Sequence, residues 1–201
     1  LSCEAKVNEV MRNEFDMDQL AKNVITSICN LLDYPVGAFH LVNRSQKTLK
    51  MRTGFAIDDK LSDKKYHFGE GLAGQVALEK KMKVFYPVPE NYLKITSGLG
   101  GTTPTHIICL PALFEDETIA VLEIGLTSAP SELHLEFLET VAHDIGDAVN
   151  SMVAKVKLQE MFEKTQQQAE ELTSQQEELR VTNEDLMHKT EELQASEEEL
   201  R

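Results

Sequence analysis

The sequence predicts an α+β domain that is followed by one long helix. Over the first three quarters of the chain, short hydrophobic strands alternate with stretches whose apolar residues have helical spacing. All ten glycines and all six prolines lie before residue 147. The last 47 residues contain neither, and leucines recur there at every seventh position. The glycines and prolines before residue 147 therefore indicate a globular part, and the seven-residue spacing of leucines after it indicates an extended helix.

Charge and composition exclude several classes of function. The 201 residues include 20 Lys and Arg against 34 Asp and Glu, a formal net charge of −14. We therefore expect no nucleic-acid partner and no binding to an anionic membrane surface. The longest apolar run, 107–114, is far shorter than the roughly 20 residues that a membrane helix needs, so no membrane insertion is expected. The three cysteines are few and widely spaced, which is typical of reduced thiols and predicts a cytoplasmic location.

The first half of the domain is expected to contain three helices and three strands. Apolar residues at helical spacing predict a helix over 1–15, and a stronger helix follows, which we expect Asp18 to cap. Asp33-Tyr34-Pro35 ends that second helix. The elements predicted next are strands at 36–43 and 48–54, a short helix at 71–80 and a strand at 83–86.

The second half is expected to hold a long loop, a hairpin and a helix without a stop signal. Residues 87–105 are rich in Pro, Gly, Ser and Thr and are interpreted as a loop. Two strands, 106–114 and 118–126, are joined by Glu115-Asp116-Glu117, which indicates a hairpin. The last helix begins near Ser131, and Gly146 lies inside it at a cost of about 1 kcal/mol relative to alanine.

The spacing of leucines predicts that the tail forms a coiled coil. The leucines in heptad register are Leu158, Leu172, Leu179, Leu186, Leu193 and Leu200. The other seam positions hold polar residues, namely Gln176, Asn183, Thr190 and Glu197. A polar seam weakens the coil, and a buried asparagine favours parallel dimers in one register. We therefore expect a parallel homodimer through the terminal helices, with an interface that includes Leu172, Leu179, Asn183, Leu186, Leu193 and Leu200.

Composition sets the expected domain boundaries. Residues 1–15 are interpreted as an N-terminal linker helix, 16–152 as the globular domain, and 153–201 as the coiled-coil helix. The chain begins with Leu1 instead of methionine, so we expect it to be a piece of a longer polypeptide.

Two motifs that suggest chemistry have simpler interpretations. Residues 69–74 match the G-x-G-x-x-G pattern of dinucleotide sites, but polar residues precede them where such a site needs a buried strand. We therefore predict a tight turn into the 71–80 helix. His143-Asp144 resembles the metal-binding pair of one phosphohydrolase family, yet the other histidines form no ligand-like cluster, so no metal is expected. No ATP-binding glycine boxes follow His143 or His188, and we expect no kinase active site and no enzyme activity in this chain.

Cysteine and glutamate positions on the strands and helices are more informative. Cys29 and Cys109 have apolar neighbours, which raise the pKa of a thiol, and they are predicted to be structural. Glu123 interrupts a hydrophobic strand, in which alternation places it on one face with Ile119, Val121 and Gly125. A carboxylate is costly to bury alone, so this face must meet solvent, a basic partner or a polar cavity. Both a solvated edge and the wall of a ligand pocket remain open.

These features together resemble a GAF domain over about residues 16–152. The resemblance rests on Gly-Glu-Gly-Leu-Ala-Gly-Gln-Val-Ala at 69–77, on Val121-Leu122-Glu123-Ile124-Gly125, and on the order of elements. The repeats at 175–180 and 183–186 resemble the signalling helices that link such domains to histidine kinases in bacterial hybrid sensors.

The resemblance implies an antiparallel sheet of five or six strands with its terminal helices on one face and a small-molecule cavity on the other. Candidate ligand contacts beneath the 87–105 loop are His40, Tyr86, Tyr92, Ile95, Ser97 and Glu123. The sequence departs from three subgroups: it shows no Asn-Lys-Phe-Asp pattern of the cyclic-nucleotide binders, no obvious bilin cysteine, and no cysteine cluster of the methionine sulfoxide reductases. It identifies no cofactor.

The preferred hypothesis is a cytoplasmic sensory module that binds a small molecule and signals through a dimeric coiled coil to an output domain. That output domain is expected to be a histidine kinase of a two-component system. A ligand-free dimerisation and spacer module is the alternative, and an enzyme of the reductase type is a third hypothesis.

Overall fold

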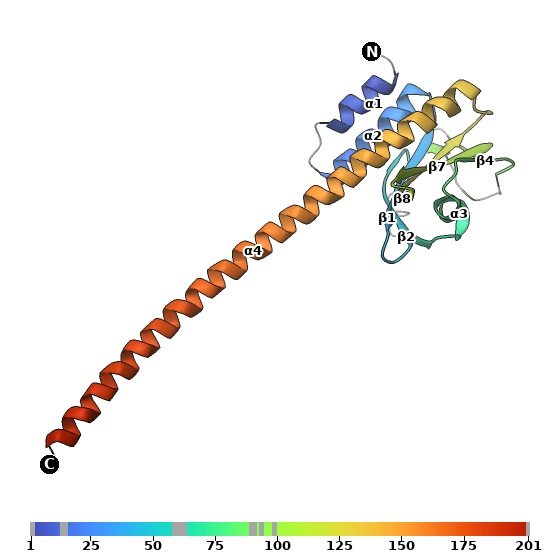
Figure 1. Ribbon diagram of the computed structural model, residues 1–201. Coiled ribbons are helices and arrows are strands. Elements are labelled where there is room, and N and C mark those ends of the chain that lie inside the picture. The colour runs from blue at the N-terminus through green and yellow to red at the C-terminus, as the bar shows by residue number, and fades with distance from the viewer. Residues whose placement is uncertain are drawn as a thin grey trace. The chain divides into compact units, whose positions relative to one another are not determined.

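The protein combines one large antiparallel sheet with helices on both of its faces, as the α+β prediction requires (Figure 1). The computed structural model describes residues 3–12, 16–57, 64–88, 92, 95–97 and 100–199. Contacts divide the chain into two units, Leu1–Val153 and Ala154–Arg201.

Six strands form the main sheet in the order β3-β2-β1-β8-β7-β4, and every neighbouring pair is antiparallel. Their bounds are β1 Val36–Asn43, β2 Thr48–Phe55, β3 Lys65–His67, β4 Lys83–Phe85, β7 His106–Phe114 and β8 Glu117–Leu126. The predicted hairpin between β7 and β8 is confirmed, and both turn residues, Glu115 and Asp116, have positive φ angles. Positive φ at both positions matches the right-handed twist of the flanking strands.

The helices are α1 Cys3–Arg12, α2 Met17–Leu31, α3 Gly71–Glu79 and α4 Glu132–Glu199. The prediction that Asp18 caps α2 is wrong. Asp16 is the cap: its backbone is extended, and its carboxylate accepts a hydrogen bond from the Gln19 backbone N–H at 3.4 Å. Asp18 lies inside the first turn, where its charge favours the helix N-terminus, and it forms an ion pair with Arg52 of β2.

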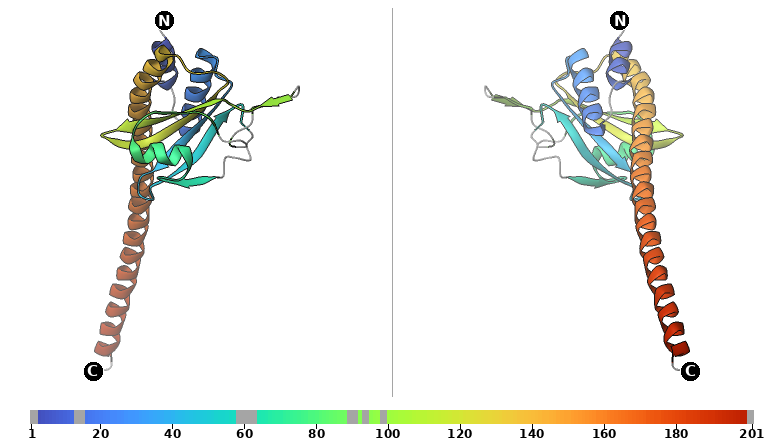
Figure 2. Two further views of the ribbon diagram at one scale, coloured as in Figure 1. Left: turned by 90° about the vertical axis from the view of Figure 1, so that its right-hand side faces the viewer. Right: turned by 90° about the vertical axis from the view of Figure 1, so that its left-hand side faces the viewer.

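The main core lies between the sheet and the helices α1, α2 and the first part of α4 (Figure 2). The helices α2 and α4 each contribute the stripe of apolar residues that the sequence pattern predicts. The fully buried members include Leu20, Val24 and Ile28 from α2, and Leu138, Val141, Ile145 and Val149 from α4. Burying these side chains supplies the hydrophobic stabilisation of this layer, at roughly 1.5–3 kcal/mol for each large residue.

The alternation of β8 differs from the prediction at one position. Ile119 lies in the helix-side core, although simple alternation places it on the Glu123 face. The register explains this, because Ala112 pairs with Ala120 but Leu113 pairs with Thr118, so Ile119 is the extra residue of a bulge. Val121 and Glu123 keep the predicted face.

On the opposite face, α3 covers β7 and β8 and builds a smaller core (Figure 1). Ala73, Val76 and Ala77 of α3 pack with Ile107 and Val121 of the sheet. The glycine-rich segment makes the tight turn into α3 that the sequence predicts. Gly69 and Gly71 have positive φ angles, and a Cβ at Gly74 would lie 2.4 Å from the His67 carbonyl oxygen.

Two segments contain strands that the sequence analysis missed. The predicted 87–105 loop includes β5 Ile95–Ser97 and β6 Gly100–Thr102, which pair as a separate two-stranded sheet. Their β-branched residues favour extended backbone, a signal that the high glycine and proline content concealed. Lys65–His67 forms β3, which pairs with β2 and places Tyr66 opposite Leu49.

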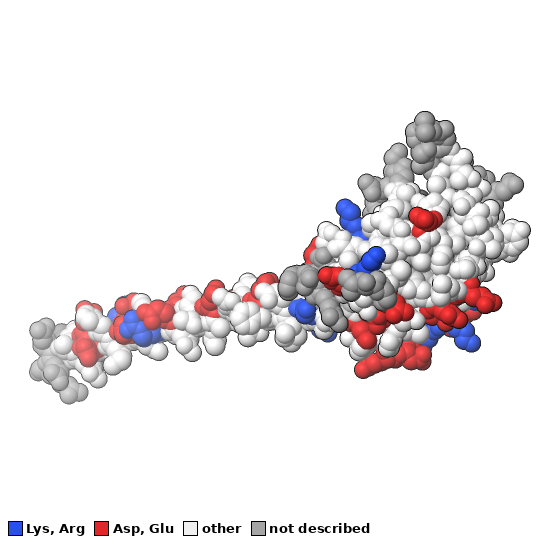
Figure 3. Space-filling view, turned by 90° about the horizontal axis from the view of Figure 1, so that it is seen from above, with Lys and Arg blue, Asp and Glu red and all other residues white. Residues whose placement is uncertain are grey.

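The second unit is a single stretch of α4. No breaker interrupts it, as predicted, and all of its described side chains are exposed to solvent. The heptad leucines Leu158, Leu172, Leu179, Leu186 and Leu193 are 57–70% exposed in the single chain; Leu200 lies outside the described residues. Acidic side chains recur along this helix (Figure 3). Arg180 forms ion pairs with Glu177 and Glu184. Over the residues described, no helix is long and apolar enough to cross a bilayer.

Gly146 allows α4 to lie directly against β7, and this contact generates a prediction. A Cβ at Gly146 would meet the Leu113 carbonyl oxygen at 2.0 Å. Gly146→Ala should therefore lower the free energy of unfolding by about 1–3 kcal/mol, despite a gain in helix propensity of about 1 kcal/mol. Chemical denaturation measures this change. Ser151→Ala, on the exposed side of the same helix, is the control and should shift stability by less than about 0.5 kcal/mol. A Gly146→Ala protein as stable as the parent would contradict the packing.

Candidate functional site

The candidate site lies on the sheet face opposite α2 and α4, where three neighbouring strands present polar side chains. Glu123 of β8 pairs in register with Ala38 of β1 and with Cys109 of β7. His40 lies two residues further along β1, opposite Val121. Because residues two apart on a strand share a face, His40 and Glu123 point to the same side of the sheet.

One polar contact in this group joins His40 to Glu123. The His40 Nε2 and Glu123 Oε2 atoms are 3.4 Å apart, and the two side chains are only 4% and 14% exposed. The contact lacks hydrogen-bond geometry, so both ring nitrogens of His40 are buried without a hydrogen-bond partner among the described residues. A buried polar group without a partner costs about 1–3 kcal/mol. The pair therefore concentrates unsatisfied polarity at one point of an otherwise apolar face.

Two tyrosines complete the surroundings of Glu123. The Tyr92 hydroxyl lies within reach of the Glu123 carboxylate, which can accept a hydrogen bond from it. Burial, followed by the charge of Glu123, raises the pKa of Tyr92 well above its usual range. Tyr66 lies edge-on to the His40 ring with centroids 6.2 Å apart, and burial together with the charges of Glu123 and Glu70 raises its pKa. Both phenols therefore remain protonated donors beside the carboxylate at neutral pH.

The other predicted ligand contacts are placed less closely. Tyr86 is 71% exposed at the end of β4 and stacks on His106 with centroids 4.5 Å apart. Ile95 is half-buried in β5, where it pairs with Thr102. Ser97 ends β5, and its side chain lies outside the described set. The structure thus brings together His40, Tyr92 and Glu123 and leaves Tyr86 at the sheet edge.

Tyr66 is the residue of this group that the sequence analysis missed. It belongs to the short strand β3, which the polar run before Gly69 concealed. The sequence signal that could have identified it is the alternation of an aromatic residue with polar neighbours at 65–67, and in the structure Tyr66 is the half-buried member.

The buried cysteines lie on opposite faces of the sheet. Cys29 of α2 belongs to the helix-side core, where burial raises its pKa to about 12. Cys109 belongs to the core under α3, where burial, followed by the charge of Glu123, raises its pKa. Cys3 is exposed on α1. Both buried thiols are therefore protonated and poorly nucleophilic, as predicted from their neighbours.

The His-Asp pair of α4 has a structural contact. Asp144 accepts a hydrogen bond from the Asn8 side-chain amide of α1 at 2.8 Å, which joins α1 to α4. Within the described ranges, no three His, Cys, Asp or Glu side chains are grouped so that they could hold a metal ion.

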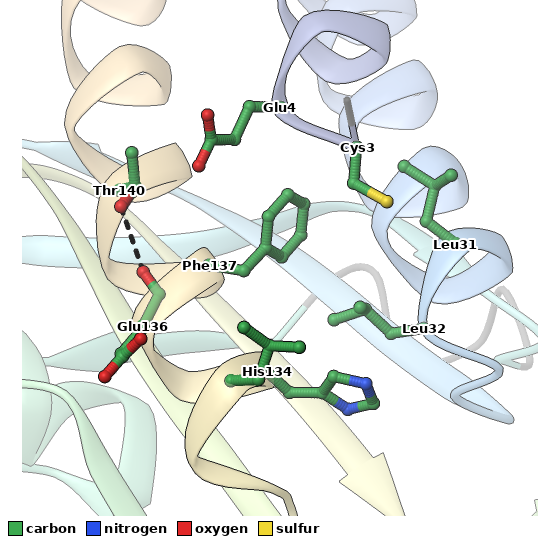
Figure 4. A pocket seen from close by; sticks show the side chains of 9 residues that line it. Cys3, Glu4, Leu31, Leu32, His134, Glu136, Phe137 and Thr140 are labelled. Carbon is green, nitrogen blue, oxygen red and sulfur yellow. Dashed lines mark hydrogen bonds between the residues drawn. The ribbon is translucent and has the colours of Figure 1, made fainter. Parts of the chain in front are cut away.

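A hollow of about 430 Å³ lies on the helix side, between α1, the end of α2 and the start of α4 (Figure 4). Leu31, Leu32 and Phe137 make most of its lining apolar, while His134 is held by a 2.8 Å hydrogen bond with the Tyr34 hydroxyl. Leu133 at its rim is 73% exposed. This hollow is separated from Glu123 by the thickness of the sheet and the helix-side core, so it is not part of the candidate site.

Comparisons with known proteins agree with this architecture. Solved structures that resemble the chain include the following three. The GAF domain of a phosphoenolpyruvate-protein phosphotransferase from Coxiella burnetii has a TM-score of 0.66 at 17% identity, covering 77% of this chain and 95% of that chain. A segment of a methyl-accepting chemotaxis protein has a TM-score of 0.59 at 11% identity, covering 77% and 99%. The free methionine-R-sulfoxide reductase of Neisseria meningitidis, solved in complex with its substrate, has a TM-score of 0.55 at 17% identity, covering 74% and 89%.

A search of curated proteins finds no match. The structural likenesses establish the fold alone, because their sequence identities are low. A family model provides the stronger result: the model of the GAF domain matches residues 15–150, which is more than half of the chain. The chain therefore belongs to the GAF domain family, a family of regulatory domains found in signalling proteins.

Proposed function

We propose that this chain is a cytoplasmic sensory GAF domain that binds a small molecule at the site formed by His40, Tyr92 and Glu123. Binding is relayed through α4, which pairs with the same helix of a second copy as a parallel coiled coil. The recipient is an output domain, a histidine kinase, in the longer protein. Membership in a family of regulatory domains supports the general role.

The observation on which ligand binding depends is the unsatisfied polarity of His40. Both of its ring nitrogens are buried without a partner among the residues described, and the Glu123 carboxylate is 3.4 Å away. A neutral imidazole offers one donor and one acceptor, and a carboxylate offers acceptors only. A small polar molecule with complementary groups would satisfy both side chains and recover the free energy that their burial costs.

Strand β8 provides a physical route from the site to α4. Glu123 faces the site, while its neighbours Leu122 and Ile124 belong to the helix-side core. That core also contains Leu138 and Ile145 of α4. Because a close-packed core transmits small displacements, a shift of β8 on ligand binding would change how α4 packs.

A ligand-free dimerisation and spacer module is the second candidate. The exposed heptad leucines favour it, because they need a partner helix whether or not a ligand binds. Native mass spectrometry of the purified protein separates the two. A small molecule that co-purifies with the dimer supports sensing, whereas a bare dimer supports the spacer.

A reductase role is the least favoured. Cys29 and Cys109 lie in cores on opposite sides of the sheet, so they are not placed to form a disulfide with each other. Cys3 is exposed on α1, which packs on the helix side. We therefore infer that this chain is not itself an enzyme.

The first prediction of the proposed function concerns ligand binding. In a thermal-shift screen of small metabolites, a molecule that stabilises the parent should lose its effect on Glu123→Ala, because the main acceptor is removed. Glu123→Gln keeps the shape of the side chain but removes its charge, and it replaces the alanine variant in the screen if that variant folds poorly. Glu115→Ala, which removes an exposed turn carboxylate, should respond like the parent. Stabilisation that is unchanged in both Glu123 variants would remove Glu123 from the site.

The second prediction concerns the dimer. The 47 residues of the tail span roughly 70 Å as a helix, which leaves a long apolar stripe for a partner. Analytical ultracentrifugation at micromolar concentration should give a dimer. Asn183→Leu should raise the melting temperature of the coil and broaden its choice of oligomeric state, since an apolar seam is stronger but less selective. Ser174→Leu, outside the seam, is the matched control and should change neither. A monomer, or antiparallel spin-label distances at position 183, would refute the proposal.

The third prediction concerns the thiols. The double variant Cys29→Ala, Cys109→Ala should fold and dimerise, with a cavity cost of about 1–2 kcal/mol in the free energy of unfolding. Cys3→Ala should cost almost nothing, because Cys3 is exposed. Assays with free methionine sulfoxide and a dithiol reductant should detect no turnover by the parent. Turnover that disappears in the double variant would show that the chain is a reductase.

A further inference from the structure

A second pocket lies at the most basic part of this acidic chain. Between residues 44 and 83 the sequence has ten Lys and Arg and five Asp and Glu, a local excess of five positive charges in a chain of net charge −14. This segment forms the strands β2 and β3, the helix α3 and β4. This part of the GAF domain therefore has a local excess of positive charge, whereas residues 155–201 hold six basic and thirteen acidic side chains.

Three cationic side chains from two separate turns line the edge pocket, a hollow of about 240 Å³. Arg44 and Lys47 belong to the turn between β1 and β2, and Lys80 is the C-cap of α3. The remaining lining residues are the apolar Phe68, Ala77 and Leu78, and Glu117 with Thr118 at the start of β8. An apolar floor beneath converging charges is the usual composition of a small-molecule site.

The contacts of these cations leave positive charge available. Arg44 reaches Glu117 at 3.4 Å and donates to the Asn150 side-chain oxygen of α4 at 2.9 Å. Lys80 reaches Asp116 at 3.3 Å. The Lys47 ammonium has no partner in the described part of the chain, although its backbone is fixed by hydrogen bonds with Arg44 and Phe68. The lining holds three positive charges and one negative, the Glu117 carboxylate, and Asp116 beside Lys80 adds a second negative charge, which leaves an excess of one, on Lys47.

We propose that the edge pocket binds a small organic dianion, with a phosphate monoester or a dicarboxylate as the charged group and a short apolar part. The charged group contacts Lys47 and the guanidinium of Arg44, and Lys80 adds a third positive charge. The apolar part lies on Phe68 and on Leu78, which is 55% exposed. The edge pocket shares no lining residue with the His40–Glu123 site, where the charged group is a carboxylate. The proposal therefore does not depend on the function proposed above.

The ligand also meets a residue that contacts α4. Arg44 is shared between Glu117 of the sheet and Asn150 of the helix, so a dianion that draws the guanidinium toward it competes with Asn150. A bound dianion therefore acts on α4 at a point close to the end of the first unit, Val153.

Isothermal titration calorimetry on the full chain at constant ionic strength tests the site. Phenyl phosphate and phenylmalonate, the two dianionic probes, distinguish a phosphate site from a carboxylate site. Benzoate and benzyl alcohol provide a monoanion and a neutral molecule of similar apolar size. We expect at least one dianion to bind with saturation, benzoate to bind about tenfold more weakly, and benzyl alcohol to show no binding. Equal affinity for the dianions and benzyl alcohol, or no dianion binding at millimolar concentration, would overturn the proposal.

Matched variants locate the site. Lys47→Gln and Arg44→Gln should each weaken dianion binding about tenfold, the usual effect of losing one charge-assisted hydrogen bond. Lys81→Gln removes the same charge one residue beyond Lys80 and outside the pocket lining, and it should weaken binding by less than about twofold. These residues are exposed, so thermal melting should confirm that every variant folds. An effect of Lys81→Gln equal to that of Lys47→Gln would show only diffuse charge attraction and would refute the pocket.

Discussion

The strand β8 has to satisfy two cores at once, and the rest of the domain depends on this constraint. One face of β8 presents Leu122 and Ile124 to α2 and α4, and the other presents Val121 and Glu123 to the face that α3 partly covers. With both faces covered, each polar side chain on β8 must find a partner within the protein or from a ligand. Thr118 finds one in the Ala77 carbonyl of α3 at 2.9 Å. Glu123 is only partly paired, by Tyr92 and by the nearby His40.

This incomplete satisfaction is the reason to interpret the Glu123 face as a binding site. An apolar side chain at position 40 would remove the orphaned imidazole and would stabilise the free protein. Tyr66 and Tyr92 surround the carboxylate with apolar area and keep protonated hydroxyls beside it. Functional sites often lower the stability of a free domain, because their polar groups obtain all of their hydrogen bonds only when a ligand is present.

The helix α4 has two kinds of surface along one uninterrupted backbone. Up to Met152 its apolar stripe is buried on the domain, and Gly146 permits direct contact with the Leu113 carbonyl. Beyond Val153 its leucines are exposed, and polar residues such as Asn183 occupy alternate seam positions. In the proposed dimer, this helix would be fixed tightly at one end and weakly paired at the other, so that it could change its packing at a modest cost in free energy. That property suits a relay better than a fully apolar coil would.

The sequence by itself determined the α+β class, the bounds of the longer strands, the uninterrupted final helix and the burial of Cys29 and Cys109. These features depend on local periodicity and on breakers, which neighbouring residues along the chain define. Only the tertiary structure decided that Asp16 caps α2, that Ile119 is the extra residue of a bulge, and that β3, β5 and β6 form. It also decided which side chains meet: the candidate Tyr92 and the unpredicted Tyr66 lie beside Glu123, while Tyr86 stacks on His106. Short strands and bulges gain their stability from pairing with distant segments, so the positions that they give to side chains cannot be inferred from local sequence.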